Sequence, residues 1–222
     1  MQRAWVMVGV STVMAAMGFG VLFTMAVFLT PLAAEFGWPR ADVSLAYAVA
    51  TIGTGLGGIL MGHFADRMPV RPIAVAGAVV PAAALALLAG TQSLAELYAY
   101  HALMGLFGVG AILAPLNSLA AKWLARNPGL AIGILSAGGA AGQGLVPFFA
   151  RHLVLMDGWR HAYLVLGIAY LAVMLPLALA IRDAPRPSAA ALAASAVAYA
   201  RSRIQVLAVL CAAVVFCCVC MA

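Results

Sequence analysis

Long apolar runs separated by short polar segments dominate the chain. A helix of about 20 apolar residues crosses the roughly 30 Å hydrocarbon layer of a bilayer. The runs are continuous and lack the period-two alternation of strands, and backbone groups in lipid must be hydrogen-bonded internally. The pattern therefore predicts an all-α, polytopic membrane protein. Its six predicted spans are residues 4–32, 43–61, 72–90, 94–121, 129–150 and 162–181.

Beyond the sixth run the pattern changes. Residues 183–203 open with Asp-Ala-Pro-Arg-Pro-Ser and continue as an alanine-rich stretch, and a further apolar run occupies residues 204–222. The chain is thus predicted to divide into a six-helix transmembrane bundle at 1–182, a linker at 183–203, and the beginning of a seventh span at 204–222.

Composition and charge agree with the membrane prediction. The chain is 66% hydrophobic and 8% charged, whereas a soluble domain carries about 25% charged residues. The net charge is +6, but the basic residues lie singly between apolar runs, so no nucleic-acid surface is expected. An excess of basic residues on one side of the predicted spans places the N-terminus in the cytoplasm. That side holds Arg3, Arg67, Arg71, Lys122, Arg126, Arg182, Arg186, Arg201 and Arg203, against Arg40, Arg151 and Arg160 on the other.

No pattern for enzymatic chemistry is found. The spans hold no acid pair and no deep histidine facing a serine. The four cysteines lie together in the last apolar run without a following histidine, which favours small membrane-helix residues over a metal site. We predict no catalytic residue, no metal and no cofactor.

Neutral polar residues inside the spans are the candidates for a substrate cavity. No Asp, Glu, Lys or Arg lies in the middle of any of the six runs, although intramembrane charge usually marks function. Thr24, Asn117 and Gln143 remain as candidates. Each of the three either faces a ligand or makes an interhelical hydrogen bond.

Glycine pairs at four-residue spacing predict where helices pack closely. Gly58 and Gly62 form one such pair, and Gly138 and Gly142 another. Small residues at this spacing allow two membrane helices to approach backbone to backbone.

The most informative segment is the charged loop between the second and third runs. Residues 62–71 read Gly-His-Phe-Ala-Asp-Arg-Met-Pro-Val-Arg. This sequence resembles the signature loop of major facilitator transporters, and the positions that match are Gly62, Asp66, Arg67 and Arg71. Pro69 and Val70 depart from it. Residues 35–46, 122–138 and 158–160 are similar to the monocarboxylate and oxalate/formate branch of the same superfamily.

The resemblance implies a twelve-span fold of two six-span halves, each built from inverted three-span repeats. This chain would then be a fragment: the N-terminal half, the central cytoplasmic loop at 183–203 and the opening of a seventh span, with the C-terminal half missing. In the family the matched loop acts as a conformational switch. Asp66 is expected near the N-terminus of a neighbouring helix, where a carboxylate is favoured.

The implied function is secondary active transport by alternating access in the lipid bilayer, in a bacterial inner membrane. The expected substrate is a small organic anion such as a monocarboxylate, moved by a symporter with protons or by an antiporter through exchange. The alternative is a non-transporting half-transporter that dimerises or serves as a binding subunit.

Overall fold

The computed structural model describes residues 2–183. The predicted linker, apart from Asp183, and the predicted seventh span lie outside the described residues. Within them every element is a helix and none is a strand, so the all-α prediction is confirmed. The elements are α1 (Gln2–Phe23), α2 (Met25–Phe36), α3 (Arg40–Ala65), α4 (Val70–Leu88), α5 (Leu94–Leu103), η1 (Met104–Val109), α6 (Gly110–Trp123) and α7 (Pro128–Ala180).

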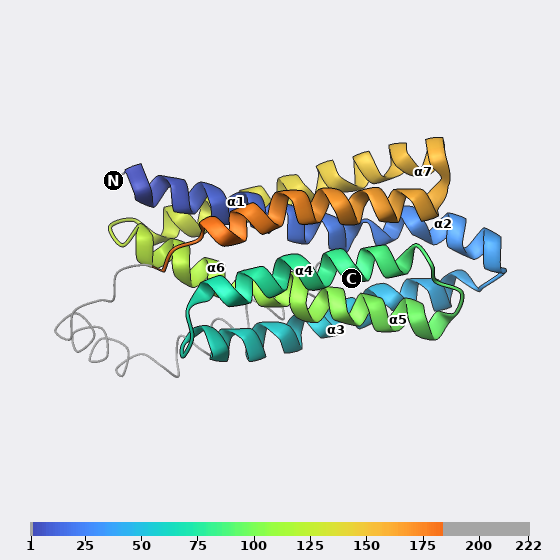
Figure 1. Ribbon diagram of the computed structural model, residues 1–222, viewed down its shortest axis with the longest axis horizontal. Coiled ribbons are helices and arrows are strands. Elements are labelled where there is room, and N and C mark those ends of the chain that lie inside the picture. The colour runs from blue at the N-terminus through green and yellow to red at the C-terminus, as the bar shows by residue number, and fades with distance from the viewer. Residues whose placement is uncertain (1, 184–222) are drawn as a thin grey trace, which may run out of the picture. The chain divides into compact units, whose positions relative to one another are not determined.

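These helices combine into five continuous helical stretches that are long and apolar enough to span a membrane. α1 and α2 form the first, and α5, η1 and α6 form the fourth. The last stretch, α7, contains a reversal at Gly158, whose φ of 80° and ψ of 168° are not helical. Figure 1 shows α7 running out along the bundle, turning, and returning beside its first part. Only glycine adopts this backbone conformation without strain, so Gly158 separates the fifth and sixth predicted spans.

α1 and the first part of α7 pack backbone to backbone. A Cβ atom on Gly142 would overlap the carbonyl group of Ala16, and one on Gly138 would lie 3.0 Å from the carbonyl oxygen of Thr12. Figure 1 shows the two helices side by side. The prediction of close packing at Gly138 and Gly142 is therefore confirmed.

α3 packs equally closely against the fourth span, but not through the predicted pair. Nothing lies within 4 Å of a Cβ built on Gly58, and the nearest atom to one on Gly62 is 3.8 Å away, so that prediction is wrong. The close contact uses Gly57, where a Cβ would overlap the carbonyl of Leu106. Gly57 lies one position from Gly58 and so about 100° around the helix, and the sequence spacing did not distinguish the two faces.

The fourth span contains a wide helical turn. η1 is a π-helical segment, and at its end the Gly110 N–H donates to the carbonyl of Gly105, five residues earlier. A Cβ on Gly110 would lie 2.9 Å from the carbonyl oxygen of Thr54 in α3 and 2.8 Å from the Cα of Gly57. Such turns occur mostly as single interruptions inside α-helices and frequently at functional sites.

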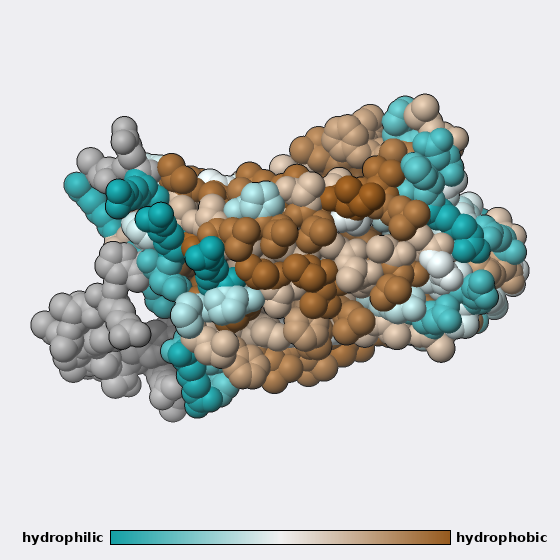
Figure 2. All heavy atoms as spheres, in the orientation of Figure 1, coloured by the Kyte–Doolittle hydropathy of each residue, from teal (hydrophilic) through white to brown (hydrophobic). Residues whose placement is uncertain are grey.

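The surface of the bundle has the distribution expected of a protein in a bilayer. Figure 2 shows, on the face in view, a broad hydrophobic belt across the middle of the bundle, with hydrophilic residues at both ends. Large apolar side chains are strongly exposed on the helices, among them Ile52, Ile59, Phe148, Leu155 and Ile168. A soluble monomer rarely exposes so much contiguous apolar surface, so lipid or another membrane-embedded surface covers this belt.

Candidate functional site

A pocket of about 250 Å³ lies between α1, α6 and the first part of α7. Its polar lining consists of Asn117 on α6 and of Ser136 and Gln143 on α7. The structure thus brings two of the three predicted cavity residues onto one surface. The remaining lining residues are small or apolar: Ala15, Phe19, Leu113, Leu135, Gly139 and Ala140.

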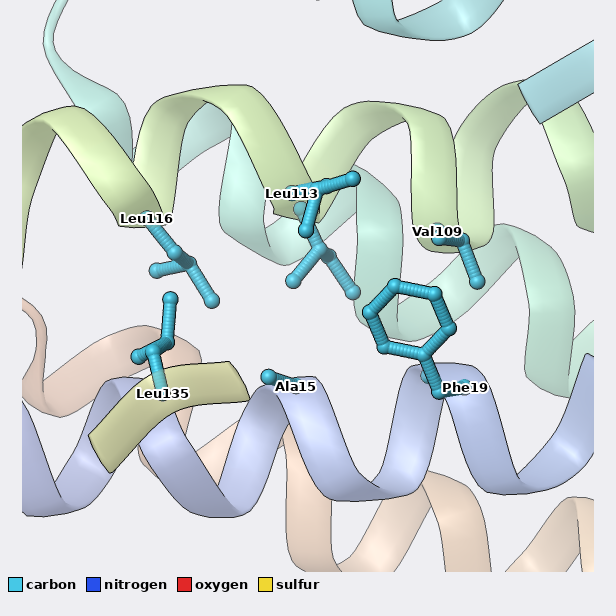
Figure 3. A pocket seen from close by; sticks show the side chains of 8 residues that line it. Ala15, Phe19, Val109, Leu113, Leu116 and Leu135 are labelled. Carbon is cyan, nitrogen blue, oxygen red and sulfur yellow. The ribbon is translucent and has the colours of Figure 1, made fainter. Parts of the chain in front are cut away.

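Next to this pocket is a narrow and wholly apolar one, drawn in Figure 3. It shares four lining residues with the polar pocket, and its volume of about 10 Å³ is no more than one water molecule needs. Phe19 projects from α1 toward Val109 and Leu113, and Leu116 meets Leu135 (Figure 3). The polar pocket is therefore bounded on this side by a well-packed apolar wall.

Thr24 is not part of this pocket. Its side chain is buried, and its hydroxyl donates to the carbonyl of Val21 over 2.7 Å. Thr24 lies at the junction of α1 and α2, where a local hydrogen bond satisfies the hydroxyl. The structure therefore separates Thr24 from Asn117 and Gln143.

Ser136 is the one polar residue of this pocket lining that was not among the candidates chosen from the sequence. It lies seven positions before Gln143, and residues seven apart on a helix share a face. The seven-residue spacing could therefore have identified Ser136 as a further candidate once Gln143 had been chosen. With Ser136 the pocket offers two amides and one hydroxyl, all of which can both donate and accept hydrogen bonds.

The pocket has no charged lining residue. Its hydrogen-bonding groups are all neutral, so they can orient a polar ligand but cannot neutralise a charge. In the part of the chain that the structure describes, one ion pair is formed, between Arg160 and Glu35, and it belongs to a different place in the bundle.

That ion pair is the centre of a network joining three spans at one end of the bundle. Arg160 donates to Glu35 Oε1 over 2.9 Å and to the carbonyl of Ala89 over 3.1 Å. The Trp159 indole N–H donates to the other carboxylate oxygen of Glu35. The Arg160 guanidinium also lies 4.4 Å from the centre of the Trp159 ring. The network ties the end of α2 and the end of the third span to the turn at Gly158.

Replacing Arg160 with glutamine should lower the stability of the bundle modestly. The ion pair is half-exposed and worth little by itself, but the hydrogen bond to Ala89 and the cation–π contact are lost with it. Together these amount to about 1–2 kcal/mol, or roughly 3–6 °C in a thermal unfolding scan in detergent. Arg151→Gln, an exposed arginine on the same helix, is the control, and equal melting temperatures for both variants would contradict the prediction.

The predicted switch loop joins α3 to α4. α3 ends at Ala65, and the backbone N–H groups of Asp66 and Arg67 donate to the carbonyls of Gly62 and Phe64 over 3.2 and 3.0 Å. Asp66, Arg67 and Arg71 are exposed, and the Arg67 guanidinium contacts His63.

A carboxylate lies at the start of α4, and it belongs to Asp183. Asp183 Oδ1 accepts from the N–H of Val70, the first residue of α4, over 2.9 Å. A helix N-terminus favours a carboxylate because its first N–H groups are unpaired. Asp183 is 113 positions from Val70 in sequence, so no local pattern indicates this contact, and the expectation for Asp66 stays a prediction.

A bundle of membrane-length helices enclosing a small, largely apolar pocket with a few polar groups defines a multi-pass membrane protein that can bind a small molecule. The sequence model of the Major Facilitator Superfamily matches residues 8–222. The chain belongs to this superfamily, as its resemblance predicted, and its relatives are transporters and not enzymes.

Individual relatives support this assignment. The chain is 30% identical to the uncharacterized MFS-type transporter YcxA of Bacillus subtilis, over 68% of this chain and 37% of that protein. It is 27% identical to monocarboxylate transporter 11 of Mus musculus (79% and 41%) and 32% identical to the gallate transporter of Pseudomonas putida (71% and 37%). The chain thus spans about two fifths of the length of these relatives.

A solved structure shares the fold. A bacterial homologue of the human lysosomal transporter Spinster, crystallised in an inward-facing and unoccupied conformation, superimposes with a TM-score of 0.72 at 19% identity. The match covers 83% of this chain and 44% of that chain. It shows that the all-α bundle has the fold of a part of that transporter structure.

Proposed function

We propose that the chain is the N-terminal half of a secondary active transporter that moves small organic anions, such as monocarboxylates, by alternating access. The observation that carries the proposal is the 250 Å³ pocket in which Asn117, Ser136 and Gln143 lie among apolar side chains. Relatives named as monocarboxylate and gallate transporters favour a carboxylate, whereas relatives named as riboflavin transporters show that the matching proteins differ in substrate.

The chemistry of the pocket favours a small anion over a sugar. A sugar presents many hydroxyl groups, each needing a partner when it leaves water, and three polar side chains are too few. A carboxylate needs two or three hydrogen bonds and one cationic partner. The neutral pocket supplies hydrogen bonds, and in this proposal the cation belongs to the C-terminal half of the transporter.

The signature loop is the proposed conformational switch. Gly62 lies near the C-terminal end of α3, and Asp66, Arg67 and Arg71 are exposed beyond it, available to a partner. In this proposal the N-terminus faces the cytoplasm of a bacterial inner membrane, because the basic residues are concentrated on that side. Transport is coupled to proton symport or to exchange.

The proposal is tested with the product of the complete gene, read past the codon for Ala222, in proteoliposomes. Uptake of labelled lactate, pyruvate and benzoate is compared with uptake of glucose, once under an inward proton gradient and once with liposomes preloaded with unlabelled carboxylate. We expect carboxylate uptake that one of the two conditions stimulates, and no glucose uptake. Uptake of glucose alone, or of none of the compounds, would overturn the proposal.

A further inference from the structure

A second pocket lies at the end of the bundle where α1 begins and where α6 and α7 end. It has a volume of about 440 Å³ and is lined by Arg3, Val6, Met7, Trp123 and Arg182. It shares no residue with the pocket of Asn117 and Gln143. Nothing in the proposed transport function uses it, so its lining needs a separate explanation.

Two guanidinium groups give this pocket its chemistry. Arginine binds phosphate oxygens through paired N–H donors in a planar fork. Neither Arg3 nor Arg182 takes part in the ion pair found among residues 2–183. The nearest acid in sequence, Asp183, is engaged elsewhere, because its carboxylate accepts from the N–H of Val70. The described lining is therefore cationic without a carboxylate to balance it.

The structure also fixes the backbone beside one of these arginines. The indole N–H of Trp123 donates to the carbonyl of Arg182 over 3.0 Å. This bond joins the end of α6 to the residues that follow α7 and holds Arg182 at the pocket. Tryptophan is enriched at the boundary between hydrocarbon and water, where headgroups lie.

The pocket is amphiphilic rather than simply basic. Val6, beside Arg3 on α1, is 58% exposed, and Met7 completes the apolar side. The hydrophilic end of the bundle that holds the start of α1 adjoins the hydrophobic belt directly (Figures 1 and 2). A ligand held here would present a phosphate to the arginines and hydrocarbon to Val6. A free phosphate would leave the apolar side unused.

We propose that this pocket binds the phosphate of an anionic phospholipid, with one acyl chain lying along Val6. Basic pockets at the ends of membrane helices attract anionic headgroups in this way. The inference does not depend on the transported substrate. It gives Arg3 and Arg182 a role in binding lipid, in addition to their contribution to the charge asymmetry that orients the spans in the membrane.

The test uses the full 222-residue chain, purified in mild detergent, delipidated and examined by native mass spectrometry. The probes are dioleoyl phosphatidylglycerol, dioleoyl phosphatidylcholine and inorganic phosphate as a competitor. We expect preferential retention of phosphatidylglycerol, reduced about thirtyfold in the R3Q/R182Q double variant, since each arginine near a membrane surface contributes roughly fivefold. The R126Q/R151Q double variant removes the same charge elsewhere and should retain the lipid.

Three outcomes would overturn the proposal. They are equal retention of the two lipids, unchanged retention in R3Q/R182Q, and displacement of the lipid by millimolar inorganic phosphate, which would indicate a site for soluble anions. If the R3Q/R182Q variant does not elute as a single folded species in size-exclusion chromatography, lipid retention is measured on the R3K/R182K variant instead. It keeps both charges and loses the planar forks, so a several-fold reduction supports the proposal and unchanged retention contradicts it.

Discussion

Replacing Asn117 with leucine and Gln143 with methionine together should reduce substrate uptake by the complete transporter at least a hundredfold at low substrate concentration. Both changes nearly conserve side-chain volume, so the pocket keeps its shape and loses its amides. A hydrogen bond to a charged ligand is worth about 1.5–3 kcal/mol, and each 1.4 kcal/mol corresponds to a factor of ten. Initial uptake rates over a range of substrate concentrations would measure the loss.

The control for this experiment is Ser118→Ala. Ser118 follows Asn117 on α6 but is exposed and does not line the pocket. We expect normal uptake by this variant and comparable amounts of both proteins in the membrane. If the double variant transports at the rate of the control, Asn117 and Gln143 do not contact the substrate, and the pocket assignment is wrong.

The second large effect, on the stability of the bundle, is expected when a single methyl group is added between the backbones of α1 and α7. Gly142→Ala places a Cβ on the carbonyl of Ala16, and because that atom is backbone no rotamer change relieves the overlap. Overpacking of this kind costs about 1–3 kcal/mol. We expect the melting temperature of the bundle, followed by size-exclusion chromatography after heating in detergent, to fall by roughly 3–10 °C.

Gly144→Ala is the matched control on the same helix. Nothing lies within 4 Å of a Cβ at Gly144, and alanine is better than glycine inside a helix by about 1 kcal/mol. The two substitutions should therefore move the melting temperature in opposite directions. A rise for Gly142→Ala would show that α1 and α7 can separate without penalty, contrary to the close packing described here.

The helical spans could be predicted from the sequence because lipid imposes a simple rule on composition. Their ends were less predictable. α3 begins at Arg40 rather than residue 43, and α2 continues to Phe36, beyond residue 32. Hydropathy marks the hydrocarbon layer, whereas a helix extends into the interface, where Glu35 and Asp42 are tolerated. The start of α5 is an exception: it begins at Leu94, as the apolar run predicted, and there the Ser93 hydroxyl oxygen accepts a hydrogen bond from the Glu96 N–H.

The candidate site could be predicted only in part. Asn117 and Gln143 stand out because amides are rare within apolar runs, but their sharing of one pocket depends on how α6 and α7 pack. The partners Glu35 and Arg160 are 125 residues apart, and no local pattern links them. Likewise, Asp183 reaches Val70 only because the sixth span ends beside the start of α4.

The wide turn in the fourth span also sets the helical phase of everything before it. A π-helical turn holds one residue more than an α-helical turn, and one residue corresponds to about 100° of rotation. α5 is therefore rotated relative to α6 from where an uninterrupted helix would place it. Converting η1 to a regular α-helix without removing a residue would turn the buried face of α5, with Leu97 and His101, away from its neighbours, whereas deleting one residue from η1 would largely preserve that face. A change between π and α geometry in this segment would thus act as a rotation of the whole α5 part of the span.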